Sequence, residues 1–99
     1  MTERTTRIQW LKPEEGGRSS LPAGPTYSTV ARFDVLADRW PREAWSVVLN
    51  ISAPADPRGV MTAGIRMLAG DEAPAELLSP GSKFELYEGH RCVARGEVL

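Results

Sequence analysis

The chain has 99 residues, which suits one compact domain over residues 1–99 and leaves no room for a second core. Twelve Lys and Arg against thirteen Asp and Glu give a formal charge of -1, which excludes a global positive field that would collect nucleic acid. One cysteine excludes an internal disulfide, and no apolar run approaches the roughly 18 residues of a membrane span or forms a signal peptide. We therefore expect a cytoplasmic protein that does not enter a membrane, with any RNA contact confined to a local surface.

The first half of the chain contains three segments in which apolar and polar residues alternate with the period of two that is typical of β-strands. These segments cover residues 5–11, 26–36 and 45–52. Between the first two, residues 13–25 are rich in proline and glycine, which predicts a long exposed loop.

The second half continues the same alternation over residues 61–67. Residues 75–78 could form a single helical turn between two prolines, too short to be a structural helix. The chain ends with Phe84 and Leu86, a turn at residues 88–90, and a last strand that places Cys92 on the inward face and Val93 on the outward face. This pattern predicts a β-hairpin.

Six strands, no helix of normal length, and eight prolines that all lie outside the strands predict an all-β fold. A six-stranded antiparallel β-barrel is preferred to a flat sheet because closure removes exposed edges. The residues expected in its interior are Ile8, Trp10, Phe33, Trp45, Val47, Leu49, Ile51, Ile65, Phe84 and Leu86.

Side chains for catalysis or metal binding are sparse. His90 is the only histidine and Cys92 the only cysteine, so the ligand sets of zinc sites cannot be assembled. A Cys–His dyad is conceivable, but the residue types favour His90 in a water-facing turn and Cys92 as a small core residue. Ser19 and Ser20 lie in a polar loop, and the adjacent carboxylates at residues 14–15 are expected to be ionised and solvated. With no phosphate-binding loop or dinucleotide fingerprint either, we expect no enzyme, no cofactor, no metal and no nucleotide.

Three segments, at the two ends and in the middle of the chain, carry a resemblance to a known protein family. They are EEGGR at residues 14–18, the strand at residues 60–65, and the ending GSKFELYEGHRCVARGEVL at residues 81–99. In this order they resemble the C-terminal, third β-barrel domain of bacterial elongation factor Tu, and the resemblance covers essentially the whole chain. It implies a translation-factor domain that serves as a docking surface and not as a catalyst.

The same resemblance implies that the EEGGR loop and the tip of the C-terminal hairpin face the T stem of aminoacyl-tRNA. The candidate nucleic-acid-binding residues are then Arg18, Ser19, Gly89, His90 and Arg91. Gly16, Gly17 and Gly89 are expected to supply the positive φ angles that turn the loop and the hairpin. The expected partner is tRNA or a translation-related protein.

Departures from the family pattern favour an alternative partner. Two serines follow EEGGR where the family has histidine and threonine, and AGPTYSTVARF stands where the family has a basic and aromatic stretch. The alternative is a protein–protein adaptor that has lost RNA binding, with Trp40 as its candidate interaction residue, although Trp40 could equally cover a barrel end. Arg18 could likewise fold back to pair with Glu14 or Glu88 instead of contacting RNA.

Overall fold

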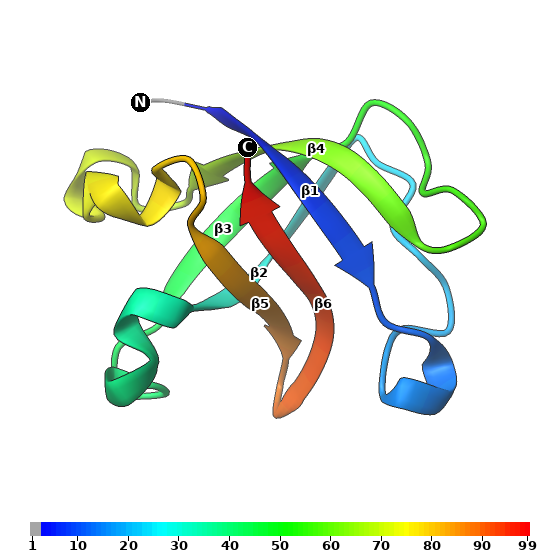
Figure 1. The fold of residues 1–99 in the computed structure, drawn as a ribbon, viewed down its shortest axis with the longest axis horizontal. Coiled ribbons are helices and arrows are strands. Elements are labelled where there is room, and N and C mark those ends of the chain that lie inside the picture. The colour runs from blue at the N-terminus through cyan, green and yellow to red at the C-terminus, as the bar shows by residue number, and fades with distance from the viewer. Residues whose placement is uncertain (1–2) are drawn as a thin grey trace.

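Six antiparallel β-strands close into a barrel in the computed structural model, which describes residues 3–99 (Figure 1). The strands are β1 (Arg4–Trp10), β2 (Thr26–Phe33), β3 (Trp45–Asn50), β4 (Val60–Met67), β5 (Lys83–Glu88) and β6 (Arg91–Val98). Around the barrel their order is β1-β4-β3-β2-β5-β6, and β6 pairs with β1 to complete the closure. The predicted all-β, six-stranded antiparallel barrel is confirmed.

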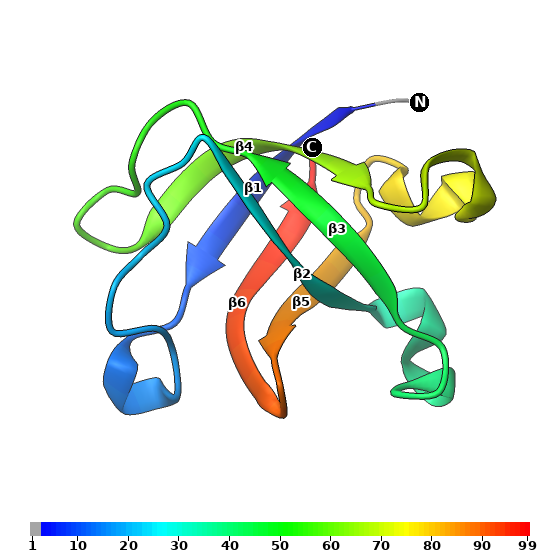
Figure 2. The ribbon, with the colours of Figure 1, turned by 180° about the vertical axis from the view of Figure 1, so that it is seen from behind.

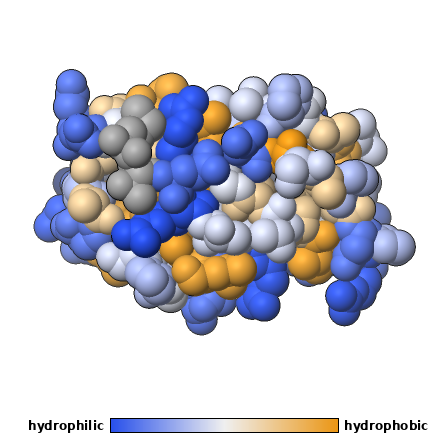
Figure 3. All heavy atoms as spheres, turned by 90° about the horizontal axis from the view of Figure 1, so that it is seen from above, coloured by the Kyte–Doolittle hydropathy of each residue, from blue (hydrophilic) through white to orange (hydrophobic). Residues whose placement is uncertain are grey.

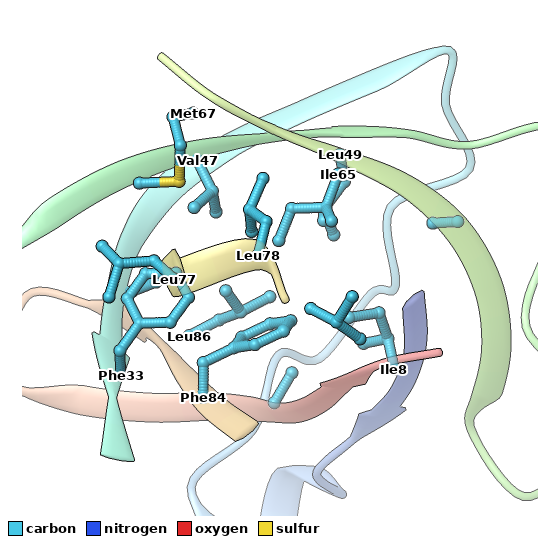
Figure 4. Close-up of a cluster of buried hydrophobic side chains, with 14 of the residues drawn as sticks. Ile8, Phe33, Val47, Leu49, Ile65, Met67, Leu77, Leu78, Phe84 and Leu86 are labelled. Atoms are coloured by element: carbon cyan, nitrogen blue, oxygen red, sulfur yellow. The ribbon is translucent and has the colours of Figure 1, made fainter. Parts of the chain in front are cut away.

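Inward-facing side chains from all six strands fill the barrel with an apolar core (Figure 4). Every residue predicted to lie in the interior is buried except Trp45, which is half-buried at the edge of the core. The indole Nε1–H of Trp45 donates to Glu43 Oε2 over 3.2 Å, which satisfies the only donor of that ring. A shift of one residue in the register of a strand would move its inward side chains to the outer face. The observed burial of the predicted side chains therefore confirms the predicted register of these strands.

A glycine in β6 makes room for a large ring in the core. Gly96 pairs with Ile8 of β1 on one side and with Phe84 of β5 on the other. A Cβ atom at Gly96 would overlap the Phe84 ring and lie 2.9 Å from Ile8 Cδ1, closer than carbon atoms normally pack. The missing side chain therefore lets the Phe84 ring pack across β6.

The predicted strand at residues 26–36 is too long. Strand β2 ends at Phe33, and residues Asp34–Arg39 form the 3-10 helix η2. The alternation of residue types continues past Phe33, but the backbone turns at Asp34. As a result Val35, which the alternation places on the same face as Phe33, is 66% exposed.

The predicted faces of the last strand are wrong at two positions. Pairing between β5 and β6 passes from Leu86–Ala94 to Tyr87–Cys92, so Val93 is the extra residue of a β-bulge. Val93 is fully buried although it was expected outside. Cys92 is half-buried and is not a core residue.

Helix η4 (Ala75–Leu78) is the single helical turn predicted between two prolines. Its Leu77 and Leu78 are buried members of the core cluster, and Figure 4 shows both among the core side chains. The prediction of one short turn is confirmed, and the turn adds two large apolar side chains to the core. The two remaining short helices, η1 (Pro13–Glu15) and η3 (Gly70–Glu72), lie in connections between strands.

The tip of the β5–β6 hairpin lies between η1 and η2 at one end of the barrel, as the front and rear views show (Figures 1 and 2). The start of β1, the C-terminal end of the chain and η4 lie toward the opposite side (Figure 1). Figure 3 looks onto that opposite side, where the coloured surface mixes hydrophilic residues with small, separate hydrophobic areas. The hairpin end, by contrast, gathers the two segments that the sequence singled out.

Candidate binding site at the hairpin end of the barrel

The loop after β1 is built around a short turn that its own residues stabilise. Glu15 Oε1 accepts a hydrogen bond from the backbone N–H of Lys12 over 2.9 Å, and the Gly17 N–H donates to the Lys12 carbonyl over 2.9 Å. Gly16 has a φ of 96°, as expected for a turn glycine. Gly17 does not have a positive φ, so that part of the prediction is wrong. It is needed for another reason, since a Cβ at Gly17 would overlap the Leu11 carbonyl.

The hairpin tip presents the other predicted group of residues to solvent. Gly89 has a φ of 63°, which confirms its expected role in the turn. His90 and Arg91 are exposed beside it, and the placement of His90 in a water-facing turn is confirmed. Arg91 also lies against the neighbouring loop, because a Cβ at Gly16 would be only 3.8 Å from Arg91 Cγ.

One carboxylate joins the loop to the hairpin. Glu88 Oε2 accepts hydrogen bonds from Arg18 Nη1 and from the Tyr27 hydroxyl, and Glu88 Oε1 lies 3.7 Å from Arg91 Nη2. The Arg18 guanidinium also stands over the Tyr27 ring, 5.4 Å from its centroid. We call these four residues, Arg18, Tyr27, Glu88 and Arg91, the Glu88 cluster. The Arg18–Glu88 pairing was one of the alternatives open from the sequence, and the structure confirms it.

The cluster changes the protonation behaviour of its members. The hydrogen bond to Glu88 raises the pKa of Arg18 above its ordinary value. Burial raises the pKa of the Glu88 carboxyl, but hydrogen bonds from Tyr27 and Arg18 outweigh that effect and hold it below its usual range. Burial, followed by the hydrogen bond to Glu88, raises the pKa of Tyr27 to about 12. At neutral pH the cluster is therefore two guanidinium groups sharing one carboxylate.

On the other side of the hairpin an aromatic pair connects the tip to the segment after η2. Trp40 packs on Tyr87, with ring centroids 4.8 Å apart and an interplanar angle of 39°. Trp40 is half-buried by this contact. The last two residues of β5 therefore connect the hairpin to its neighbours on both sides: Tyr87 contacts Trp40, and Glu88 contacts Arg18.

A cavity of about 180 Å³ lies beside the Glu88 cluster, between the end of β1, the loop after η1 and the β3–β4 connection. Lys12, Arg18 and Arg58 contribute cationic side chains to its lining, and Asp56 is its carboxylate. Trp10 also lines it, although this residue is only 2% exposed.

Sequence reasoning missed Tyr27 and the cavity residues Trp10, Lys12 and Arg58. Trp10 was assigned to the barrel interior, Tyr27 was not named as a site residue, and no local pattern reveals that Tyr27 reaches Glu88, 61 positions away. Ser19, which was predicted, is exposed and lines the cavity together with Arg18.

The remaining chemical candidates are not assembled into a reactive site. Cys92 Sγ lies 3.5 Å from the Ala94 carbonyl oxygen, and burial raises the pKa of this thiol, which disfavours the reactive thiolate. Among residues 3–99 no hydrogen bond links Cys92 to His90, and no three His, Cys, Asp or Glu side chains are grouped to hold a metal ion. None of the helices that the structure describes is long and apolar enough to cross a membrane.

No protein-family model matches the chain, and no curated protein sequence matches it significantly.

Proposed function

We propose that this chain is a non-enzymatic binding module of the translation-factor type, akin to the C-terminal barrel of elongation factor Tu, that contacts tRNA through the hairpin end. The observation that carries the proposal is that the two segments with the family-like sequence, residues 14–18 and 88–91, lie side by side and are joined by the Glu88 cluster. Residues far apart in the chain thereby form one preorganised surface, which reduces the entropy lost on binding.

The cations of this surface suit contacts to phosphate. Arg91 is the best placed, since its side chain is 55% exposed and its ion pair with Glu88 is long. Lys12 and Arg58 are exposed nearby, whereas Arg18 is held by Glu88 and acts mainly by positioning the loop. Guanidinium and ammonium groups are the usual partners of phosphate oxygens, and such contacts position a protein on RNA without reading its sequence.

The salt dependence of tRNA binding tests this proposal. Each phosphate contact contributes a slope of about -0.7 to -0.9 to the logarithm of the affinity against the logarithm of the salt concentration. Arg91→Ala is expected to reduce the slope by about one contact. Arg7→Ala is the matched control, because Arg7 is 59% exposed and has a similar ion pair, to Glu97, on the barrel wall. Absence of tRNA binding, or equal effects of the two variants, would contradict the proposal.

The protein–protein adaptor is the second candidate function, and one observation favours it. Val35 on η2 is 66% exposed, and η2 leads directly into Trp40, so this side of the hairpin end has accessible apolar surface. If the chain is an adaptor, purified protein should capture a protein from cell extract, or self-associate in sedimentation, and Val35→Asp should abolish the interaction. Tight tRNA binding that Val35→Asp leaves unchanged would argue against this candidate.

A further inference from the structure

The two oxygens of the Glu88 carboxylate are used unequally. Oε2 accepts hydrogen bonds from Arg18 Nη1 and from the Tyr27 hydroxyl, whereas Arg91 Nη2 lies 3.7 Å from Oε1. That distance exceeds the range of an ordinary N–H···O hydrogen bond. The carboxylate therefore holds Arg18 firmly, and it holds the more exposed guanidinium of Arg91 only loosely.

The ring of Tyr27 is fixed by the barrel and not by the loop. Tyr27 lies in β2, where it pairs with Leu49 of β3, and its ring packs edge-on against the buried Trp10 with centroids 5.4 Å apart. The Arg18 guanidinium lies over the same ring. Because Tyr27 is packed against the core, its hydroxyl is a donor at a fixed place relative to Glu88.

The Tyr27 hydroxyl is the neutral donor in a group of two cations and one anion. While the hydroxyl and Arg18 are both bound to Oε2, that oxygen has two donors and the carboxylate is directed toward the loop. Without the hydroxyl, the carboxylate could accept another donor, and Arg91 is the nearby cation that can supply it. Such a charge-assisted hydrogen bond is about twice as strong as a neutral one, so it would compete with a phosphate for the Arg91 guanidinium.

We propose that Tyr27 is a positioning residue of the hairpin-end surface, whose hydroxyl holds Glu88 toward Arg18 and thereby leaves Arg91 available to phosphate. The inference rests on the proposed tRNA contact. Tyr27 acts through the carboxylate and does not itself touch the RNA, whereas Arg91 makes the contact.

Tyr27→Phe tests the inference, because it removes the hydroxyl and keeps the ring that packs on Trp10 and Arg18. The affinity for tRNA is measured across a range of salt concentrations for the wild type, Tyr27→Phe, Arg91→Ala and the double variant. At low salt, Tyr27→Phe is expected to weaken binding by about three- to tenfold, the range of one hydrogen bond. It should have little further effect where Arg91 is already alanine, since the two residues act through one contact.

Tyr87→Phe is the matched control. It also removes a hydroxyl that donates to a carboxylate, in this case to Glu85 Oε1 over 3.2 Å, but that pair lies outside the Glu88 cluster. The control variant should bind tRNA with the affinity and the salt slope of the wild type.

A second measurement needs no RNA. Rotation of the Arg91 guanidinium about its Nε–Cζ bond, measured by ¹⁵N exchange NMR on the free protein, reports how firmly Glu88 holds this side chain. In Tyr27→Phe this rotation should slow at least about threefold, because Arg91 becomes hydrogen-bonded to Glu88. Tyr87→Phe should leave the rotation rate unchanged.

The outcomes separate the inference from the proposed function. Wild-type tRNA affinity of Tyr27→Phe, or an unchanged rotation rate of Arg91, overturns the inference and leaves the tRNA proposal standing. An equal loss of affinity with and without Arg91 also overturns it, because Tyr27 would then contact the RNA directly. If the wild type does not bind tRNA, the proposed function fails and the inference fails with it.

Discussion

Replacing Glu88 by alanine tests whether one carboxylate holds the η1 loop against the hairpin. Glu88 accepts hydrogen bonds from Arg18 and Tyr27 and forms a longer ion pair with Arg91, so Glu88→Ala removes three interactions at once. The substitution leaves the core untouched, because Glu88 lies at the end of β5, outside the core cluster. A loss of stability would therefore report on the cluster and not on packing.

The size of the effect follows from the partial exposure of the group. The side chains of Arg18 and Glu88 are 31% and 27% exposed, so their pair lies between a solvated surface pair and a buried one. An exposed ion pair contributes about 0–1 kcal/mol, and a hydrogen bond to a charged group about 1.5–3 kcal/mol. After a discount for solvent screening, we expect Glu88→Ala to lower the free energy of unfolding by about 2 kcal/mol.

Urea unfolding of the wild type and of Glu88→Ala measures this difference in the free energy of unfolding, provided that the m-value is the same for both proteins. Glu14→Ala is the matched control, since Glu14 is an exposed carboxylate of the same loop, and its effect should stay within about 0.5 kcal/mol. A double-mutant cycle with Arg18→Ala should give a coupling energy of about 1 kcal/mol. Equal effects of Glu88→Ala and Glu14→Ala, or a coupling energy below about 0.3 kcal/mol, would refute the role of the cluster.

Three further predictions concern the core and the titrating groups. Gly96→Ala should lower stability by about 3 kcal/mol, because the new Cβ overlaps the Phe84 ring, and an unchanged urea midpoint would contradict the packing. Burial and Glu88 raise the pKa of Tyr27 from 10.0 to about 12. The stability that the neutral Tyr27 hydroxyl contributes is therefore complete below pH about 10 and is lost as the pH rises from about 10 to about 12. Tyr27→Phe should reduce this loss, which thermal unfolding across that pH range measures. Because burial raises the pKa of Cys92, its reaction with a thiol reagent at pH about 8 should be at least about tenfold slower in the folded protein than in urea, and equal rates would contradict the burial.

The strands were predictable because the pattern that marks them is the same pattern that packs the core. Val47, Leu49 and Ile51 alternate with Ser46, Val48 and Asn50, and the barrel buries the first set in its core, although Val48 on the other face is also buried. The pattern failed where the backbone departs from regular geometry. Val35 continues the alternation, but η2 begins at Asp34, and the bulge at Val93 moves a residue between faces without any change in residue type.

The site was less predictable than the fold, because its contacts join residues that are distant in sequence. The structure brings the EEGGR loop and the hairpin tip together, and Glu88 was named as one possible partner of Arg18. Nothing local predicts that Tyr27 shares that carboxylate or that Arg58 reaches the same cavity as Arg18. These neighbours follow from barrel closure, which brings the β3–β4 connection beside the loop after β1.

The most direct test of the hairpin end as the binding surface is an NMR titration of ¹⁵N-labelled protein with tRNA at low salt. If the account is correct, the largest shifts and intensity losses fall on residues 12–20, 56–59 and 88–91, and Arg91→Ala weakens them while Arg7→Ala does not. A spectrum that tRNA leaves unchanged, or changes centred on η2 or on the outer face of β3 and β4, would contradict it.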